Sequence, residues 1–375
     1  MNTFPHALTR RLLPLADLIA ASVEARRSSG RGLLAQYVEM ARLWRLPNRI
    51  SPSEYFDFAL YDSRKLDQAA KRRFLGWRSP VVPGLQKTQW HALANDKLAY
   101  YGLMSGLGFQ IPRIFAIYNK NERYFGAVPV FKTPGLLADF LRGTACPFPF
   151  YGKPAHGFYG EGNVLCTGYV PESDALRMAS GALVRVDEFA TGLPDRSDRG
   201  YIFQQVLEPS PAIARLFGNR LSTVRIVVAL TTTSPRVVFV EWKIPTGDNI
   251  IDNFHDGATG NLLASVDPTT GRIQRVALPD GSVSSNASLS HPDTGTLLTG
   301  TAIPNWNAMV NLSLTAARAF PGLGLQGWDI ADTSTGPVPL EVNLVTGRTA
   351  YNHQHFMGKG LFDEDLQSLW VASHA

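Results

Sequence analysis

The sequence predicts an α+β protein that begins with a segment of helices, and three observations support this fold class. Residues 1 to about 85 contain apolar residues at helical spacing. Residues 223–230 and 236–243 are apolar, β-branched runs joined by a short polar segment, a pattern typical of two antiparallel strands. A helical pattern over 306–320 leads to a second predicted hairpin at 327–343. Helices and antiparallel strands therefore alternate in the second half of the chain.

The first residues resemble a secretory signal only superficially. Asp17 and Glu24 interrupt the apolar stretch that starts at residue 12, so we expect an amphipathic helix. A second helix is predicted over 33–44 and ends before Pro47, and a third begins after Ser51, where Glu54 completes a capping-box pattern. No stretch reaches the roughly 20 apolar residues that a membrane-spanning helix needs.

The composition is that of a globular enzyme and excludes several other classes. With 375 residues and 45% hydrophobic content, the chain can bury a large core in two or three domains. Cys146 and Cys166 form neither a disulfide framework nor a zinc or redox motif, which fits a reducing compartment. Much of the net charge of +5 lies in the N-terminal segment. We interpret it as a solvated basic face, with contact to nucleic acid or an anionic membrane as the alternative.

Two lysines lie at the ends of predicted elements, one at the start of a helix and one at the end of a strand. Asp96 is a typical N-cap residue, so we expect a helix that begins at Lys97, extends to residue 105 and stops at the glycines 106 and 108. Lys153 ends the strand over 150–154, and a glycine-containing loop follows it. Glycines at 157, 160 and 162 allow backbone N–H groups to approach phosphate oxygens, and a lysine adds positive charge. The loop is neither a Walker loop nor a Rossmann fingerprint.

The middle of the chain contains shorter elements. We expect strands or strand–helix pieces over 182–189 and 201–207, and a short helix over 210–217. Arg225 lies within an apolar strand, where a cation needs a partner. Residues 246–300 are rich in turn formers, and we interpret them as a mobile cover over an acceptor site. Three histidines, at positions 255, 353 and 355, are interpreted as packing or surface residues.

The last predicted hairpin is a candidate divalent-metal site. Glu341 and Asn343 are two residues apart in a strand and therefore face the same side, and Asp329 would face them from the preceding strand. Oxygen ligands of this kind suit Mg²⁺, which is usually completed by water and nucleotide phosphates.

Together these motifs resemble the ATP-grasp superfamily in its D-alanine ligase-like members, over residues 90 to 360, and most closely its sugar-transfer-associated group, named for exopolysaccharide gene neighbourhoods. The resemblance implies two α+β lobes that clasp ATP behind the helical segment. We divide the chain into a cap at 1–88, a first lobe at 89–205 and a second lobe at 206–375. The implied ATP-binding residues are Lys97, Lys153, Gly157, Tyr159, Gly160, Gly162, Gln204, Gln205, Val206 and Leu207. The implied Mg²⁺ ligands are Asp329, Glu341 and Asn343, and the implied catalytic residue is Arg225. The glutamines at 204 and 205 stand where many relatives have an acidic residue.

The resemblance implies an ATP- and Mg²⁺-dependent ligase that joins a carboxylate to an amine through an acyl phosphate. The substrates would be small molecules, such as amino acid or sugar derivatives, used in polysaccharide or secondary-metabolite assembly in the cytoplasm, with no nucleic acid as partner. Two alternatives stay open: an ATP-grasp phosphotransferase, and a weakly catalytic nucleotide-binding module in a glycan-assembly complex. The acceptor and the oligomeric state are not readable from the sequence.

Overall fold

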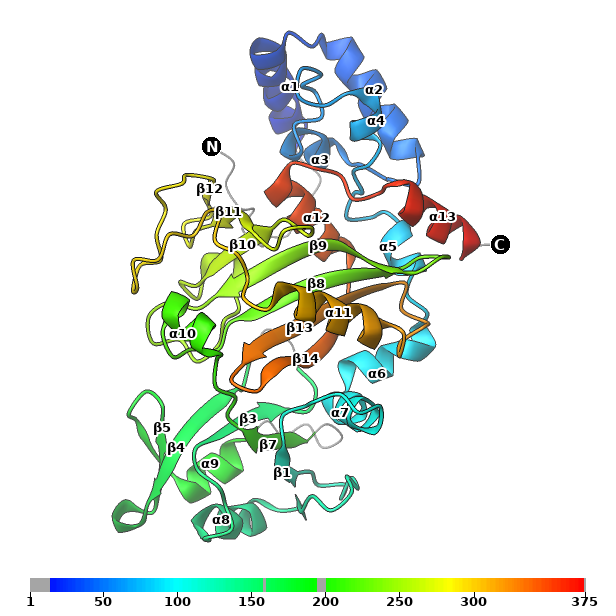
Figure 1. Cartoon of the computed structure of the whole chain (residues 1–375). Helices are drawn as coiled ribbons and strands as arrows, with labels where there is room; N and C mark the ends of the chain where they lie inside the picture. The colour runs from blue at the N-terminus through cyan, green and yellow to red at the C-terminus, as the bar shows by residue number, and fades with distance from the viewer. Residues whose placement is uncertain (1–13, 158–159, 194–199, 374–375) are drawn as a thin grey trace.

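The computed structural model describes residues 14–157, 160–193 and 200–373. Within them, the chain forms a helical cap, a middle sheet and a lower sheet, arranged from top to bottom in Figure 1. In the same residues, no helix combines the length and the apolar composition that crossing a bilayer requires.

The cap is built from helices. Its elements are α1 (Leu15–Ser29), α2 (Leu33–Arg45), α3 (Pro52–Asp57), α4 (Gln68–Lys71) and α5 (Val81–Gly84). Residues of α2, α3 and the chain after them form an apolar core that also includes Tyr351 from the C-terminal part of the chain. The predicted capping box is confirmed, since the Ser51 side chain accepts from the Glu54 backbone N–H while Glu54 accepts from that of Ser51. Below the core, Gln354 in the C-terminal part of the chain accepts from the Leu75 N–H and donates to the Leu75 carbonyl. The two ends of the chain therefore pack together.

The lower sheet has seven strands in the order β2-β1-β7-β3-β4-β5-β6. Its strands are β1 (Ile114–Tyr118), β2 (Val130–Phe131), β3 (Phe150–Pro154), β4 (Val164–Val170), β5 (Ala175–Met178), β6 (Leu183–Arg185) and β7 (Tyr201–Gln205). The helices within residues 89–205 are α6 (His91–Asn95), α7 (Lys97–Gly106), α8 (Pro134–Arg142) and α9 (Val186–Gly192), of which α6 and α7 also contact the other sheet. In Figure 1, α8 and α9 lie together on one side of this sheet. The predicted strand–loop–strand around the glycines is the β3–β4 hairpin.

The middle sheet also has seven strands, in the order β12-β11-β10-β9-β8-β13-β14. They are β8 (Thr223–Leu230), β9 (Pro235–Ile244), β10 (Leu262–Val266), β11 (Ile273–Ala277), β12 (Val283–Ser284), β13 (Leu325–Thr333) and β14 (Gly336–Leu344). The helices after β7 are α10 (Pro211–Phe217), α11 (Trp306–Ala317), α12 (Gly347–Met357) and α13 (Glu364–Ala372). Every residue of β13 is buried, because α11 covers the sheet where β8, β13 and β14 meet.

The prediction of one mobile cover over 246–300 is wrong for much of that range. Strands β10 and β11 extend the middle sheet, and their residues Leu262, Ala264, Ile273 and Val276 belong to its core. Turn-forming residues dominate the composition because the strands here are short and separated by tight turns. Residues 247–253, at the beginning of the segment, and Asp293 near its end line a cavity.

Candidate active site

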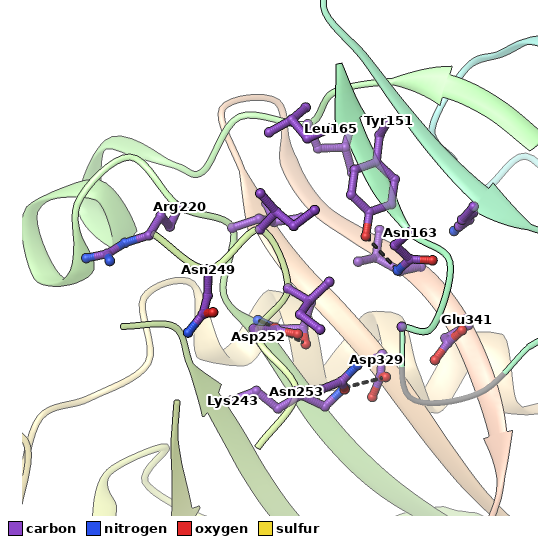
Figure 2. A pocket seen from close by; sticks show the side chains of 18 of the residues that line it. Tyr151, Asn163, Leu165, Arg220, Lys243, Asn249, Asp252, Asn253, Asp329 and Glu341 are labelled. Carbon is purple, nitrogen blue, oxygen red and sulfur yellow. Dashed lines mark hydrogen bonds and ion pairs between the residues drawn. The ribbon is translucent and has the colours of Figure 1, made fainter. Parts of the chain in front are cut away.

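One large cavity lies between the lower and the middle sheet, with a volume of about 1210 Å³. Tyr151 and Asn163 line it from the β3–β4 hairpin, and Lys243, Asp329 and Glu341 line it from the middle sheet (Figure 2). The cavity therefore collects side chains from strands more than 150 residues apart in the sequence, and it contains most of the residues that the motifs singled out.

Lys153 is buried at the end of β3 without a carboxylate partner at hydrogen-bond distance in the described residues. Its Nζ donates to the hydroxyl of Tyr101 at 2.7 Å and lies 5.0 Å from the centre of that ring. The Tyr101 hydroxyl in turn donates to Oε1 of Gln204 at 3.4 Å. Burial lowers the pKa of Lys153 to about 8, because an ammonium loses hydration there. An anion entering the cavity would relieve that cost.

Lys97 reaches the same cavity from the first turn of α7. The side chain of Asp96 caps this helix by accepting from the N–H groups of Leu98 and Ala99, as the sequence predicted. The Lys97 Nζ donates to the carbonyl of Gly157 at 3.1 Å and lies 3.9 Å from Oε2 of Glu341. Burial lowers its pKa as well, partly offset by the charge of Glu341.

The predicted glycines differ in position. Gly157 and Gly160 line the cavity, and Gly160 adopts a φ of +73° that favours glycine. A Cβ at Gly160 would lie 3.1 Å from the Asn253 side chain, so the loop closely approaches the segment between β9 and β10. Gly162 does not line the cavity, and its carbonyl accepts from the Tyr201 hydroxyl at 2.7 Å. Tyr159 lies outside the described residues.

The hinge residues 204–207 line the cavity at the end of β7. The backbone N–H of Gln205 donates to the carbonyl of Arg113 at 2.9 Å, so it is not available to an adenine ring. In the described part of the chain, Val206 and Leu207 make no backbone–backbone hydrogen bond. The backbone N–H groups that remain for an adenine ring are thus those of Val206 and Leu207, both among the residues that the resemblance implies.

Asp329 is the centre of a buried charge cluster. Both of its oxygens accept from Arg225 at 2.7 Å, and Oδ2 also accepts from Lys243 at 2.7 Å. Strand register creates this contact, because Arg225 of β8 lies directly opposite Asp329 of β13. Burial alone would raise the pKa of Asp329, but the two cations outweigh it and hold the pKa well below its usual range. The same carboxylate raises the pKa of Arg225, against the effect of burial.

Glu341 and Asn343 lie beside this cluster on β14, where Glu341 is the register partner of Asp329. The Asn343 Nδ2 donates to Glu341 Oε1 at 3.1 Å and to Asp329 Oδ2 at 3.4 Å, so the three predicted ligands meet. Among the described residues, no group of three His, Cys, Asp or Glu side chains is placed to hold a metal. An ion here would need the amide oxygen, water and phosphates, which fits Mg²⁺. Of the two predicted carboxylate ligands, Glu341 is the more available to an ion, because Arg225 and Lys243 already donate to Asp329.

Sequence reasoning missed two residues of this site. Lys243 ends the apolar run of β9 in the way that Lys153 ends β3, and this similarity could have identified it. Asp252 lines the cavity, and its Oδ2 accepts from the Thr223 backbone N–H at 2.6 Å. Burial raises the pKa of Asp252, although Lys243 and Thr223 act against that shift.

The histidines interpreted as packing residues are placed as follows. His353 is buried, stacks on Phe239 with ring centres 3.8 Å apart, and contacts Glu241 Oε1 through Nδ1 at 2.9 Å. His355 is buried and stacks on Tyr351. None of the three histidines lines the cavity within the described residues.

A family model described as "Sugar-transfer associated ATP-grasp" matches residues 83–368. The chain therefore belongs to that family, and its fold is the ATP-grasp fold with helices added at the N-terminus. No curated protein matches the sequence.

Solved structures that resemble the chain include three ligases. An L-amino acid ligase from Bacillus licheniformis has 12% identity and a TM-score of 0.41, with 75% of this chain and 48% of that chain covered. A D-alanine–D-alanine ligase from Helicobacter pylori has 10% identity, a TM-score of 0.41 and coverage of 76% and 63%. The VanG D-Ala:D-Ser ligase from Enterococcus faecalis has 13% identity, a TM-score of 0.40 and coverage of 77% and 64%. The match thus spans from about half to just under two thirds of those proteins.

Proposed function

We propose that this member of the sugar-transfer associated ATP-grasp family is an ATP- and Mg²⁺-dependent ligase that joins a carboxylate to an amine through an acyl phosphate. The observation that carries the proposal is the convergence of Lys97 and Lys153 with the Asp329–Glu341–Asn343 group on one cavity. Cations beside oxygen ligands match the needs of a nucleotide triphosphate with its metal.

The lower sheet would hold the nucleotide. Lys97 and Lys153 would pair with phosphate oxygens, and the backbone N–H groups of the cavity-lining Gly157 and Gly160 would donate to them. The backbone of Val206 and Leu207 would contact the adenine. When bound to Glu341, Asn343 and Asp329, Mg²⁺ would neutralise charge on the phosphates.

The middle sheet would hold the acceptor. A carboxylate of the acceptor attacks the γ-phosphorus, the bond to the β-phosphate oxygen breaks, and ADP leaves. An amine then attacks the acyl carbon, loses a proton, and displaces inorganic phosphate to give the amide. Arg225 would stabilise the acyl phosphate and the oxyanion of the second step, which requires it to shift some of its hydrogen bonding from Asp329. Lys243 shares that carboxylate and would keep it charged during the shift.

The wider setting is part of the same proposal. We divide the chain into the cap at 1–88 and lobes at 89–205 and 206–375, consistent with strands β1 to β7 falling in the first lobe and β8 to β14 in the second. We place the reaction in the cytoplasm, in the assembly of a polysaccharide or secondary metabolite. The family description supports a link to sugar transfer.

The test is an assay of ADP release and product mass with ATP, Mg²⁺ and a panel of amino acids and sugar acids. We expect ADP and phosphate in equal amounts with one new amide. Glu341→Gln should keep the melting temperature while lowering turnover by about 100-fold or more, since ions in such sites contribute several kcal/mol to the transition state. Glu172→Gln, an exposed glutamate outside the cavity, is the matched control and should keep full turnover.

Two results would contradict the proposal. A phosphorylated acceptor that accumulates without amide formation would identify a phosphotransferase. Turnover of Glu341→Gln equal to that of the wild type at every Mg²⁺ concentration would show that the β13–β14 hairpin is not a metal site.

A further inference from the structure

The helical cap differs in charge from the rest of the chain. Residues 1–88 contain fifteen Lys and Arg residues against seven Asp and Glu residues, a charge of +8, whereas the whole chain carries +5. The remaining residues therefore carry −3. A basic region at one end of an otherwise slightly acidic protein indicates an anionic partner at that end.

The outward face of α2 carries an apolar stripe. Leu34 is 78% exposed and Val38 61%, and they lie one helical turn apart. Tyr37 and Trp44 are also exposed, and Ala41 lies between them on the same face. The opposite face of α2 is the one buried in the cap, through residues such as Met40 and Leu43. The exposed apolar residues of α2 therefore do not contribute to the packing of this helix against the cap.

The neighbouring helix α1 adds a second exposed apolar pair. Leu15 is 72% exposed and Ile19 49%, again one turn apart. The two helices pack against each other, and the Ser22 hydroxyl donates to the Tyr37 hydroxyl at 3.4 Å. In Figure 1 they form the outermost end of the molecule, with the middle sheet and then the lower sheet beyond the rest of the cap.

Arginines accompany the apolar residues. Arg42 and Arg45 are exposed in the last turn of α2, and within the described ranges neither has an acidic partner. Arg49 lies over the Trp44 ring, 5.8 Å from its centre. On α1, Arg26 and Arg27 occupy the last turn, and among the described residues Arg27 pairs with Glu24 at 3.9 Å whereas Arg26 has no acidic partner. Exposed aliphatic, aromatic and cationic side chains thus occur together on these two neighbouring helices.

We propose that the outward face of α1 and α2 docks on an anionic lipid surface. The apolar side chains would enter the headgroup region, the arginines would contact lipid phosphates, and Trp44 and Tyr37 would sit at the boundary. A membrane fits this face better than a protein does, because the face is convex helix surface with scattered unpaired arginines. A lipid surface presents phosphate groups at every point, so the arginines can contact them without the shape complementarity that a protein partner needs. The reaction cavity lies between the sheets, away from this end.

The test is co-sedimentation of the full chain with vesicles of phosphatidylglycerol and phosphatidylcholine, compared with vesicles of phosphatidylcholine alone. We expect binding to the anionic vesicles that weakens in high salt. Arg42→Gln with Arg45→Gln should weaken it by about 25-fold, as roughly 1 kcal/mol per arginine near a charged surface corresponds to about fivefold each. Leu34→Ser with Val38→Ser should weaken it by about tenfold through lost apolar insertion.

Matched controls make the same changes elsewhere. Arg215→Gln with Arg318→Gln removes two exposed arginines of α10 and the end of α11, and Leu183→Ser with Leu297→Ser removes two leucines of similar exposure. Both control pairs should bind like the wild type, and all variants should melt like it. Equal binding by the α2 variants and their controls would overturn the proposal, as would equal binding to both kinds of vesicle. A dimer that the Leu34 and Val38 changes dissociate, without lipid binding, would assign the face to a second copy of the chain.

Discussion

Lys153 and Lys243 are both 7% exposed, and each lies near the end of a strand that faces the same cavity from a different sheet. Their surroundings differ. Lys243 donates to Asp329 at 2.7 Å, so its charge is compensated within the protein. Within the described ranges, Lys153 donates at that distance to a neutral hydroxyl and to no carboxylate, and its pKa falls to about 8. Lys243 thus has its counter-charge within the protein, whereas the charge of Lys153 is available to an anionic ligand.

The difference has an energetic origin. A buried cation without a partner costs free energy, which the fold tolerates when a ligand later supplies the charge. A buried carboxylate between two cations has the opposite property, because removing it would leave both unpaired. Lys153 is therefore expected to matter for binding, and Asp329 for folding as well as for chemistry.

The largest effect is expected for Asp329→Asn. This change removes the carboxylate that pairs with buried Lys243 and partly exposed Arg225, and should lower the free energy of unfolding by about 3–5 kcal/mol. Denaturant titration measures it. Asp363→Asn is the control, since Asp363 pairs with Arg236 at a half-exposed position and should lose no more than about 1 kcal/mol. Equal losses of unfolding free energy in the two variants would show that the contacts of Asp329 with Arg225 and Lys243 stabilise the fold no more than an exposed ion pair does.

A smaller effect, on binding instead of folding, is expected for Lys153→Met. The affinity for a non-hydrolysable ATP analogue should fall by about 1.5–3 kcal/mol, the range of a charged hydrogen bond. Stability should be unchanged or slightly higher, since an uncompensated buried charge is removed. Calorimetric titration and thermal melting report the two quantities. Lys120→Met, at an exposed position, should change neither. Unchanged affinity in Lys153→Met would remove this lysine from the phosphate site.

The third expected effect is a dependence of stability and ATP affinity on pH. The pKa of Lys153 is lower in the folded protein, at about 8, than its ordinary value of 10.5, so the unfolded chain binds more protons between these values. The stability of the ligand-free protein should therefore rise from about pH 8 to 10.5, relative to Lys153→Met, by at most about 1.4 kcal/mol per pH unit. ATP affinity should fall over the same window as the ammonium is lost. Parallel stability curves for the two proteins would show that Lys153 keeps an ordinary pKa.

Local signals in the sequence determined much of the fold. The Ser51–Glu54 capping box and the Asp96 cap are confirmed, because both depend on residues within one helical turn. The pairing of Glu341 with Asn343 on one face follows from the two-residue period of a strand. The order of motifs over some 250 residues identified the ATP-grasp family, which the family match confirms.

Tertiary structure alone decided which charges meet. Arg225, Lys243 and Asp329 come from three strands up to 104 residues apart, and only the register of β8, β9 and β13 places two cations on one carboxylate. No local pattern encodes register between distant strands, since side-chain alternation leaves every even shift equally acceptable. Strands β10 and β11 were not predicted within the turn-rich residues 246–300. Both strands are short, and pairing with neighbouring strands of the sheet stabilises them more than their own sequence does. The sequence thus determined the elements and the family, while long-range pairing of strands decided which lysine is neutralised and which is left for a ligand.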